Sequence, residues 1–207
     1  MKLLKLSRLS FGTAGIPLSA KAERTEEGIK QVRKLGLDAL ELEFVRQVYI
    51  KKDETPEIRD VAKKENVMLT CHAPYFINLS TQEKKKLYAS IGYIYNSAKI
   101  AALCGAYSVT FHAAYYMQEK PEKVFAAVRE HVKHILKKLE DEGLKIWLRP
   151  EITGRVSQFG SLQELLKLSQ ELEYVMPCID FSHLHARTNG KFNSYEEFSA
   201  ILAEVEK

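Results

Sequence analysis

The chain of 207 residues is 45% hydrophobic and 28% charged, which predicts an ordinary soluble globular protein with one domain over residues 1–207. Its formal net charge of +4 is too mild to indicate a polyanionic partner by itself, and no apolar run approaches the roughly 18 residues of a membrane-spanning helix. Three widely spaced cysteines and the lack of a recognisable signal peptide predict a cytoplasmic protein with no membrane partner.

Short β-branched or aromatic runs alternate with longer runs of helical periodicity along the chain. In chain order, the predicted elements are strand 9–15, helix 25–35, strand 38–44, helix 55–65, strand 67–72, helix 81–104, strand 107–112, helix 119–142, strand 145–151, helix 161–172, strand 174–180 and helix 194–207. Strict alternation with continuously apolar strands predicts right-handed βαβ units on a parallel sheet, and hence an α/β fold.

Two architectures satisfy this alternation, an open doubly wound sheet and a (β/α)8 TIM barrel. Six βα units in 207 residues give about 34 residues each, so eight units would need about 275 residues, near the usual size of such a barrel. The sequence therefore fits an open sheet, or a TIM barrel in which six βα units are present and the last two are missing.

Polar residues that are typical metal ligands recur where the predicted strands end. The residues at or just beyond the ends of the last five strands are Glu41, Glu43, His72, His112, Glu151, Asp180 and His183. In parallel α/β folds the carboxyl ends of the strands meet on one face, and functional sites are built on that face. We therefore expect the last five of these residues to lie near one another.

Each of these residues also has an ordinary structural interpretation. A single histidine at a strand end is more often a hydrogen-bonded structural residue than a ligand. Glu151 can cap a helix or pair with Arg155. Asp180 can be the N-cap of a short turn, and His183 can be a loop residue. Four such side chains at four consecutive strand ends are harder to explain in this way, because unpaired buried carboxylates and imidazoles are costly. A divalent metal ion offsets that cost, and two imidazoles with carboxylates suit Zn²⁺, Mn²⁺ or Fe²⁺.

The other candidate residues have weaker patterns. His131 and His134 share a face of the predicted helix 119–142, where a solvated helix surface is the preferred interpretation. Tyr75 follows His72 in a loop, where it can cover the site, stack on a nucleic-acid base or close the barrel mouth. The sequence contains no Gly-rich phosphate-binding motif, no G-x-S-x-G elbow and no cysteine in the setting of a nucleophile.

Four segments carry a family resemblance, namely HAPYFINLS, FHAAYY, RPEITG and CIDFSHLHA. In this order and at these spacings the chain resembles the endonuclease IV family (AP endonuclease family 2, with a xylose isomerase-like TIM barrel) over nearly its whole length. The resemblance implies a (β/α)8 barrel with up to three Zn²⁺ ions, Mn²⁺ or Fe²⁺ being alternatives. It also implies hydrolysis of the DNA phosphodiester 5′ to abasic sites in base excision repair.

The resemblance implies a role for each matching residue. His72 and His112 would ligate one zinc ion, and Glu151 would bridge it to a second. Asp180 would bind that second ion, and His183 would belong to the third. Glu151 would then be the catalytic residue of a metal-assisted hydrolysis that needs no basic nucleophile from the protein.

Partners follow from the same resemblance. Tyr75 matches the loop tyrosine that the family inserts into DNA near the lesion, so the implied partner is double-stranded DNA with abasic sites.

The family's remaining ligands would lie beyond Lys207. His185 matches no family ligand and is interpreted as a loop histidine. A gap in the barrel would expose strand edges, through which copies of the chain could form an oligomer.

Two alternatives stay open at this point. A xylose isomerase-like sugar isomerase or epimerase uses a related barrel and a similar metal set, but it needs a closed sugar pocket in place of an open, basic rim. A non-catalytic DNA-binding remnant would keep the fold without the full set of ligands, in line with the missing last quarter of the barrel.

Overall fold

The computed structural model describes residues 8–21 and 24–206, and within them it has five strands and seven helices. The strands are β1 (Gly12–Ala14), β2 (Ala39–Glu43), β3 (Met68–His72), β4 (Ser108–Phe111) and β5 (Trp147–Pro150). The helices are α1 (Thr25–Lys34), α2 (Thr55–Lys64), α3 (Lys84–Leu103), α4 (Pro121–Asp141), α5 (Leu162–Glu171), α6 (Phe181–Arg187) and α7 (Tyr195–Val205).

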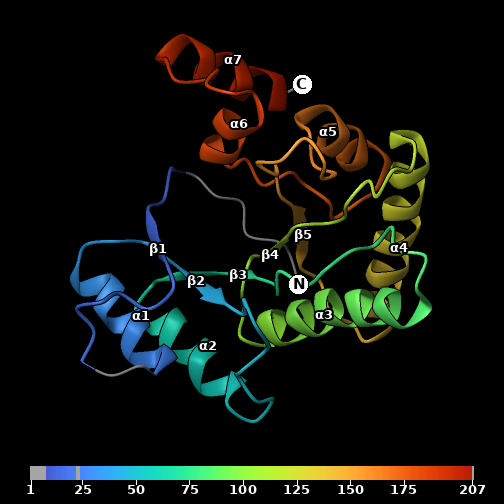
Figure 1. The fold of residues 1–207 in the computed structure, drawn as a ribbon. Coiled ribbons are helices and arrows are strands. Elements are labelled where there is room, and N and C mark those ends of the chain that lie inside the picture. Colours follow the sequence, from blue (N-terminus) through green and yellow to red (C-terminus); the bar gives the residue numbers. More distant parts are fainter. Residues whose placement is uncertain (1–7, 22–23, 207) are drawn as a thin grey trace.

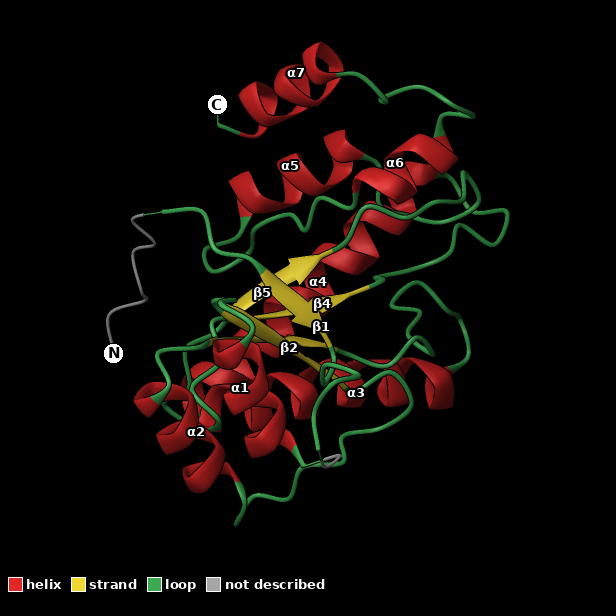
Figure 2. Ribbon diagram, turned by 90° about the vertical axis from the view of Figure 1, so that its left-hand side faces the viewer, coloured by secondary structure: helices red, strands yellow, loops and turns green. Residues whose placement is uncertain are grey.

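The five strands form a parallel sheet in the order β1-β2-β3-β4-β5. Neighbours in the sequence are neighbours in the sheet, so the strand order never reverses, as it would at the switch point of a doubly wound fold. Helices α1 to α4 follow one another around the outside of the strands (Figure 1). Figure 2 shows the strands between α1, α2 and α3 on one side and α5, α6 and α7 on the other. This is the winding of a TIM barrel, and it decides between the two predicted architectures.

The predicted strand 174–180 does not form as a continuous strand. Its place beside β5 is marked by two isolated parallel bridges, Leu148 to Val175 and Glu151 to Cys178. Pro177 lies between the two bridges, and proline has no N–H to donate to a sheet. The carbonyl of Pro177 accepts hydrogen bonds from the Arg149 guanidinium instead. The segment therefore follows β5 in the parallel direction without completing a sixth strand.

The structure contains a helix that the sequence did not predict. α6 begins directly after Asp180 and includes His183 and His185, so the interpretation of His185 as a loop histidine is wrong. Asp180 is the N-cap, and its Oδ1 accepts a hydrogen bond from the His183 backbone N–H at 2.7 Å. A helix of seven residues is too short for apolar periodicity to reveal it.

The apolar core lies between the sheet and the outer helices. All four residues of β4 are buried, because this strand has a neighbour on each side and helices behind it. α4 contributes Val128, Val132 and Ile135, spaced on one face of the helix and fully buried. Among the described residues, no helix is both long and apolar enough to cross a membrane.

Candidate metal centre

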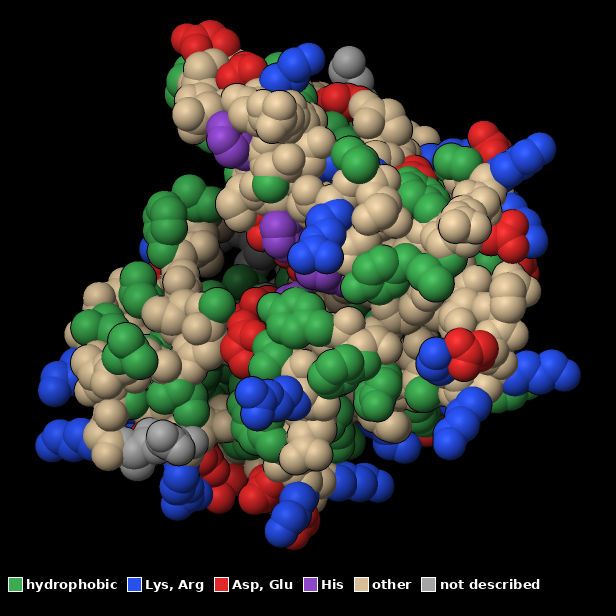
Figure 3. Space-filling view, viewed as in Figure 1, with side chains coloured by type: hydrophobic (Ala, Val, Ile, Leu, Met, Phe, Trp, Pro, Cys, Tyr) green, Lys and Arg blue, Asp and Glu red, His purple; other side chains and the backbone are tan. Residues whose placement is uncertain are grey.

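The five predicted ligand residues are brought together at the carboxyl ends of the strands. His72 is the last residue of β3, His112 follows β4 directly, and Glu151 follows β5 directly. Asp180 and His183 reach the same place from the start of α6. In Figure 3, viewed as Figure 1, histidine and acidic side chains gather in a hollow near the middle of the molecule. The prediction that strand ends converge here is therefore confirmed for all five residues.

His72, His112 and Glu151 form a first group of possible ligands. Oε2 of Glu151 lies 3.1 Å from Nε2 of His72 and 3.0 Å from Nε2 of His112. One ligand atom from each residue lies within 4.8 Å of the others, a separation that a single bound cation can span. His72 and Glu151 are buried, with 6% and 7% of their surfaces exposed, so water cannot satisfy these groups instead.

The hydrogen bonding of the first group fits a metal ion. Nδ1 of His72 lies 2.6 Å from the Ala73 carbonyl oxygen, to which it donates, and this orients Nε2 toward the carboxylate. Each ring nitrogen of His72 faces a hydrogen-bond acceptor, as both would in a protonated imidazolium. A divalent cation can therefore take the place of the proton on Nε2. Nε2 of His112 is buried and has no well-aligned hydrogen-bond partner among the described residues. A buried imidazole nitrogen without such a partner, close to a shared carboxylate, is the arrangement expected of a metal ligand.

Glu151, Asp180 and His183 form a second group. Nδ1 of His183 lies 3.3 Å from Oε1 of Glu151 and 3.3 Å from Oδ2 of Asp180. The carbonyl oxygen of Ile152 is 2.9 Å from the same nitrogen. Oδ1 of Asp180 serves as the helix cap, whereas Oδ2 faces His183. The two interpretations of Asp180, as cap and as ligand, are thus compatible because they use different oxygens.

The charges of the first group stabilise one another. Burial by itself raises the pKa of Glu151, but the imidazoles of His112 and His72, 3.0 and 3.1 Å from its Oε2, outweigh that effect and hold the pKa well below its usual range. Burial by itself lowers the pKa of His72, but the Glu151 hydrogen bond, the Ala73 carbonyl and the Glu151 charge raise it overall. The site therefore holds a stable anion that can bind a cation.

Glu41 and Glu43, which the sequence placed at the end of the second predicted strand but outside the expected cluster, adjoin the site. They lie two apart on β2, so they share one face of the strand, and Glu43 is paired in register with His72. Burial, the negative charge of Glu41 and a hydrogen bond between the two carboxyl groups raise the pKa of Glu43 to about 7, although the nearby His72 opposes the rise. The two-residue spacing of Glu41 and Glu43 on a predicted strand was the signal that could have placed both side chains on the face of the site.

Tyr75 covers the first group. Its ring centroid lies 4.9 Å from that of His72 and 5.4 Å from that of His112, while 49% of the residue is exposed. Tyr75 therefore separates the imidazoles from solvent on one side. The role in DNA binding stays a prediction.

The remaining histidines do not join the cluster. Nδ1 of His185 lies 2.8 Å from the Lys191 carbonyl oxygen, which ties the end of α6 to the following loop. His131 and His134 lie on α4, and neither belongs to a possible metal group among the described residues. Burial, and then the charge of His134, lower the pKa of His131.

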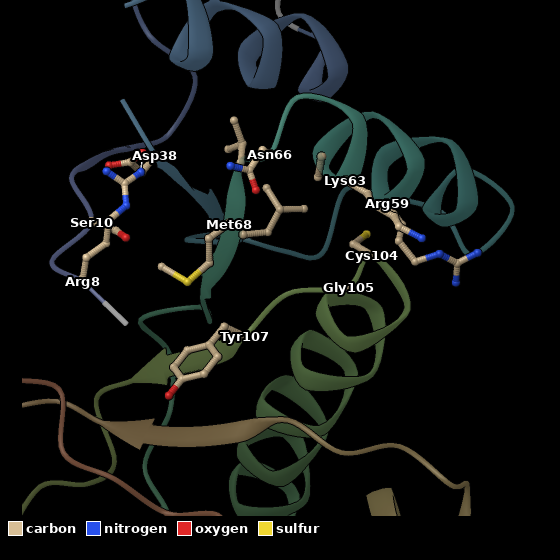
Figure 4. A pocket seen from close by; sticks show the side chains of 13 residues that line it. Arg8, Ser10, Asp38, Arg59, Lys63, Asn66, Met68, Cys104, Gly105 and Tyr107 are labelled. Atoms are coloured by element: carbon tan, nitrogen blue, oxygen red, sulfur yellow. Dashed lines mark hydrogen bonds and ion pairs between the residues drawn. The ribbon is translucent and has the colours of Figure 1, made fainter. Parts of the chain in front are cut away.

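A cavity of about 590 Å³ lies at the opposite ends of the strands. Its lining includes Ser10, Asp38, Met68 and Tyr107, residues that precede or begin β1 to β4 (Figure 4). None of the predicted ligand residues is among them, and Asp38 is paired with Arg8 at 2.7 Å. This cavity is therefore separate from the candidate metal centre.

The winding of the strands and the cluster at their carboxyl ends define a TIM-barrel protein with a histidine and carboxylate site that can hold metal ions. The sequence profile of the xylose isomerase-like TIM barrel family matches residues 29–206. The chain belongs to this family, and the resemblance found in the sequence is confirmed at that level.

One sequence relative and two solved structures show what this chain is similar to. An uncharacterized protein of Methanocaldococcus jannaschii is 42% identical over 198 residues, which cover 96% of this chain and 70% of the relative. Endonuclease IV from Thermus thermophilus superposes with a TM-score of 0.70 at 22% identity, over 93% of this chain and 70% of that one. The 3-keto-D-glucoside 4-epimerase of E. coli superposes with a TM-score of 0.72 at 13% identity, over 96% and 76%. At these identities the two structural matches establish the fold alone.

Proposed function

We propose that this protein is a metal-dependent AP endonuclease of the endonuclease IV type, which hydrolyses the DNA phosphodiester 5′ to an abasic site. The observation that carries the proposal is the position of Glu151 between two groups of ligands. Its Oε2 faces His72 and His112, whereas its Oε1 faces His183. A carboxylate with one oxygen toward each group can bridge two neighbouring metal ions, which is the arrangement used in phosphodiester hydrolysis.

The residues of this chain would hold and orient the reacting groups. Two imidazoles with carboxylates suit Zn²⁺, and Mn²⁺ or Fe²⁺ are alternatives. Such ions, when bound, would supply a nucleophile at neutral pH and stabilise the charge that develops on the phosphate. His72 is kept in one orientation by the Ala73 carbonyl, and Asp180 is kept in place by its capping hydrogen bond to His183. Double-stranded DNA with an abasic site is the proposed partner, and Tyr75, half-exposed beside the site, is the proposed contact.

An incision assay tests the proposal. The purified chain is incubated with a duplex that contains one abasic site, with Zn²⁺, Mn²⁺ or Fe²⁺ and with a chelator, and the bound metal is quantified. We expect metal-dependent incision on the 5′ side of the lesion. Glu151→Gln should lower the rate by at least about 100-fold, because even residues that only support a ligand contribute about 10- to 100-fold.

Glu173→Gln is the matched control, since Glu173 is exposed and lies outside both ligand groups. Its incision rate should equal that of the unaltered chain. Absence of both metal and incision would defeat the nuclease proposal, while metal-independent DNA binding without incision would support the non-catalytic alternative.

A second candidate function is supported by the carboxyl pair on β2. Burial and the negative charge of Glu41 raise the pKa of Glu43 to about 7, a value that suits a group that gives and takes protons at neutral pH. The superposition on a sugar epimerase is consistent with that chemistry. A sugar epimerase would exchange the proton next to the carbonyl of a ketose with deuterium from D₂O. Glu43→Gln would then slow the exchange while leaving DNA incision absent.

A further inference from the structure

Arg187, the last residue of α6, lies four residues after His183 and therefore on the same face of the helix. Its Nη1 donates hydrogen bonds to oxygen atoms of three residues that follow Glu151 in the chain. The acceptors are Thr153 O at 3.3 Å, Thr153 Oγ1 at 3.1 Å, Arg155 O at 2.7 Å and Gln158 O at 3.0 Å. We call residues 152–160 the Glu151 loop.

The hydrogen bonds of Arg187 go to neutral oxygens, and no carboxylate pairs with it among the described residues. One nitrogen with two hydrogens serves four acceptors, so these bonds are shared. Thr153 is fully buried and Gln158 nearly so, which means that water cannot replace the guanidinium at these backbone atoms. Arg187 thus gathers the carbonyl groups of the Glu151 loop around one positive charge.

The same loop lies against His183. The Ile152 carbonyl oxygen is 2.9 Å from Nδ1 of His183. A Cβ atom at Gly154 would lie 3.2 Å from Cδ2 of His183 and 3.6 Å from Cβ of Ala186, so the loop approaches the helix where it has no side chain. The orientation of the His183 ring therefore depends on the position of the loop.

We propose that Arg187 is a positioning residue, which holds the Glu151 loop against α6 and so fixes His183 relative to Oε1 of Glu151. The first ligand group does not depend on this contact. His72 and His112 stand at the ends of β3 and β4, and the Glu151 backbone N–H donates to the Phe111 carbonyl oxygen of β4 at 3.0 Å. Loss of the guanidinium should consequently weaken the second metal position and leave the first one intact. The inference rests on the metal site of the proposed function but not on DNA cleavage.

Titration with Co²⁺, followed by visible absorption and calorimetry, tests the inference on the full chain. His72→Ala and His183→Ala identify which binding step belongs to which group. We expect Arg187→Met to weaken the His183-dependent step by about 10- to 100-fold and to change its absorption spectrum, with the His72-dependent step unchanged. Arg187→Lys, which keeps the charge but not the fork of donors, should give an intermediate affinity.

Arg155→Met is the matched control, since it makes the same chemical change in the same loop while the Arg155 carbonyl remains available to Arg187. Equal binding by Arg187→Met and Arg155→Met would overturn the inference, as would an equal loss at both steps or a single Co²⁺ step in the unaltered chain. If Arg187→Met does not fold, Arg187→Lys decides by the same criteria. If the unaltered chain shows both Co²⁺ binding steps but does not incise DNA, the nuclease proposal is wrong and the inference about Arg187 still stands.

Discussion

Asp180 combines two tasks at the scale of a single residue. Oδ1 caps α6 through the backbone N–H of His183 and also accepts from the Ser182 hydroxyl at 2.6 Å, while Oδ2 faces the second ligand group. Capping needs a side-chain oxygen, which asparagine also has, whereas a strong ligand for a divalent ion needs the carboxylate charge. The two tasks can therefore be separated by substitution.

Asp180→Asn should keep the cap and lose the ligand, whereas Asp180→Ala should lose both. We expect the metal-free Asn variant to unfold in urea at nearly the same concentration as the unaltered chain, and the Ala variant to be about 1 kcal/mol less stable. Both variants should bind less metal by calorimetry. A loss of stability in the Asn variant as large as that in the Ala variant would contradict the separation.

Glu43 makes the stability of the metal-free chain depend on pH. Its pKa rises from 4.5 in the unfolded chain to about 7 in the folded one, so the folded state retains a proton that the unfolded state has lost. This contribution is fully present below pH 4.5 and is lost as the pH rises to about 7. Glu43→Gln has no proton to lose, so its stability relative to the unaltered chain should increase between those two pH values.

Urea unfolding of both chains in a chelator, at several pH values from about 4 to about 8, measures this difference. A constant difference across the range would show that the folded and unfolded states bind protons at Glu43 equally. Glu173→Gln, on an exposed carboxylate, should show no comparable increase.

At the scale of elements, β1 depends on a close approach of two backbones. A Cβ atom at Gly12 would lie 2.3 Å from the Ala39 carbonyl oxygen of β2, a contact that no backbone position within the sheet can accommodate. β1 is only three residues long, so it cannot retain its pairing if this residue is displaced. The predicted strand 9–15 forms only over Gly12–Ala14, and its first residue lies at this close approach.

Gly12→Ala should destabilise the chain by at least about 1–3 kcal/mol, because the added methyl group meets backbone atoms. Gly92→Ala is the matched control, since a Cβ atom there meets nothing within 4 Å and the residue lies inside α3. That change should stabilise the chain by about 0.5–1 kcal/mol. Thermal and urea unfolding measure both, and similar values for the two variants would contradict the account of β1.

At the scale of the whole molecule, the sheet is open at two edges among the described strands. β1 pairs with β2 alone, and the segment 174–180 pairs loosely with β5. Leu9 and Phe11, just before β1, are 76% and 62% exposed. Unpaired edges with exposed apolar side chains favour association between copies of a chain, so we propose that this protein forms oligomers through them.

Light scattering after size exclusion should therefore give a mass above 23.7 kDa that falls on dilution. Phe11→Lys should shift the chain toward the monomer, because the Phe11 carbonyl still accepts from Asp38 and Ala39 while the exposed ring is lost. Tyr195→Lys, an equivalent change at an exposed aromatic residue of α7, should leave the mass unchanged. A concentration-independent monomer would refute the proposal.

The parts of the site that follow strand periodicity could be predicted, whereas those that depend on loop contacts could not. His72, His112 and Glu151 end or follow buried strands, and parallel strands end on a common face, so their proximity follows from the chain order alone. α6 and its residue Arg187 had no such signal. A seven-residue helix has too few turns for a periodic pattern, and the partners of Arg187 are 29 to 34 residues away.

The sequence by itself determined the alternation of strands and helices and the set of residues at the carboxyl ends of the strands, because apolar periodicity and local turn residues act over short distances. Only the tertiary structure decided that Glu151 turns one oxygen toward His72 and His112 and the other toward His183. It also decided that Asp180 is both cap and candidate ligand, and that Pro177 interrupts the last strand. These outcomes depend on side-chain directions and on backbone contacts between distant segments, which no local pattern encodes.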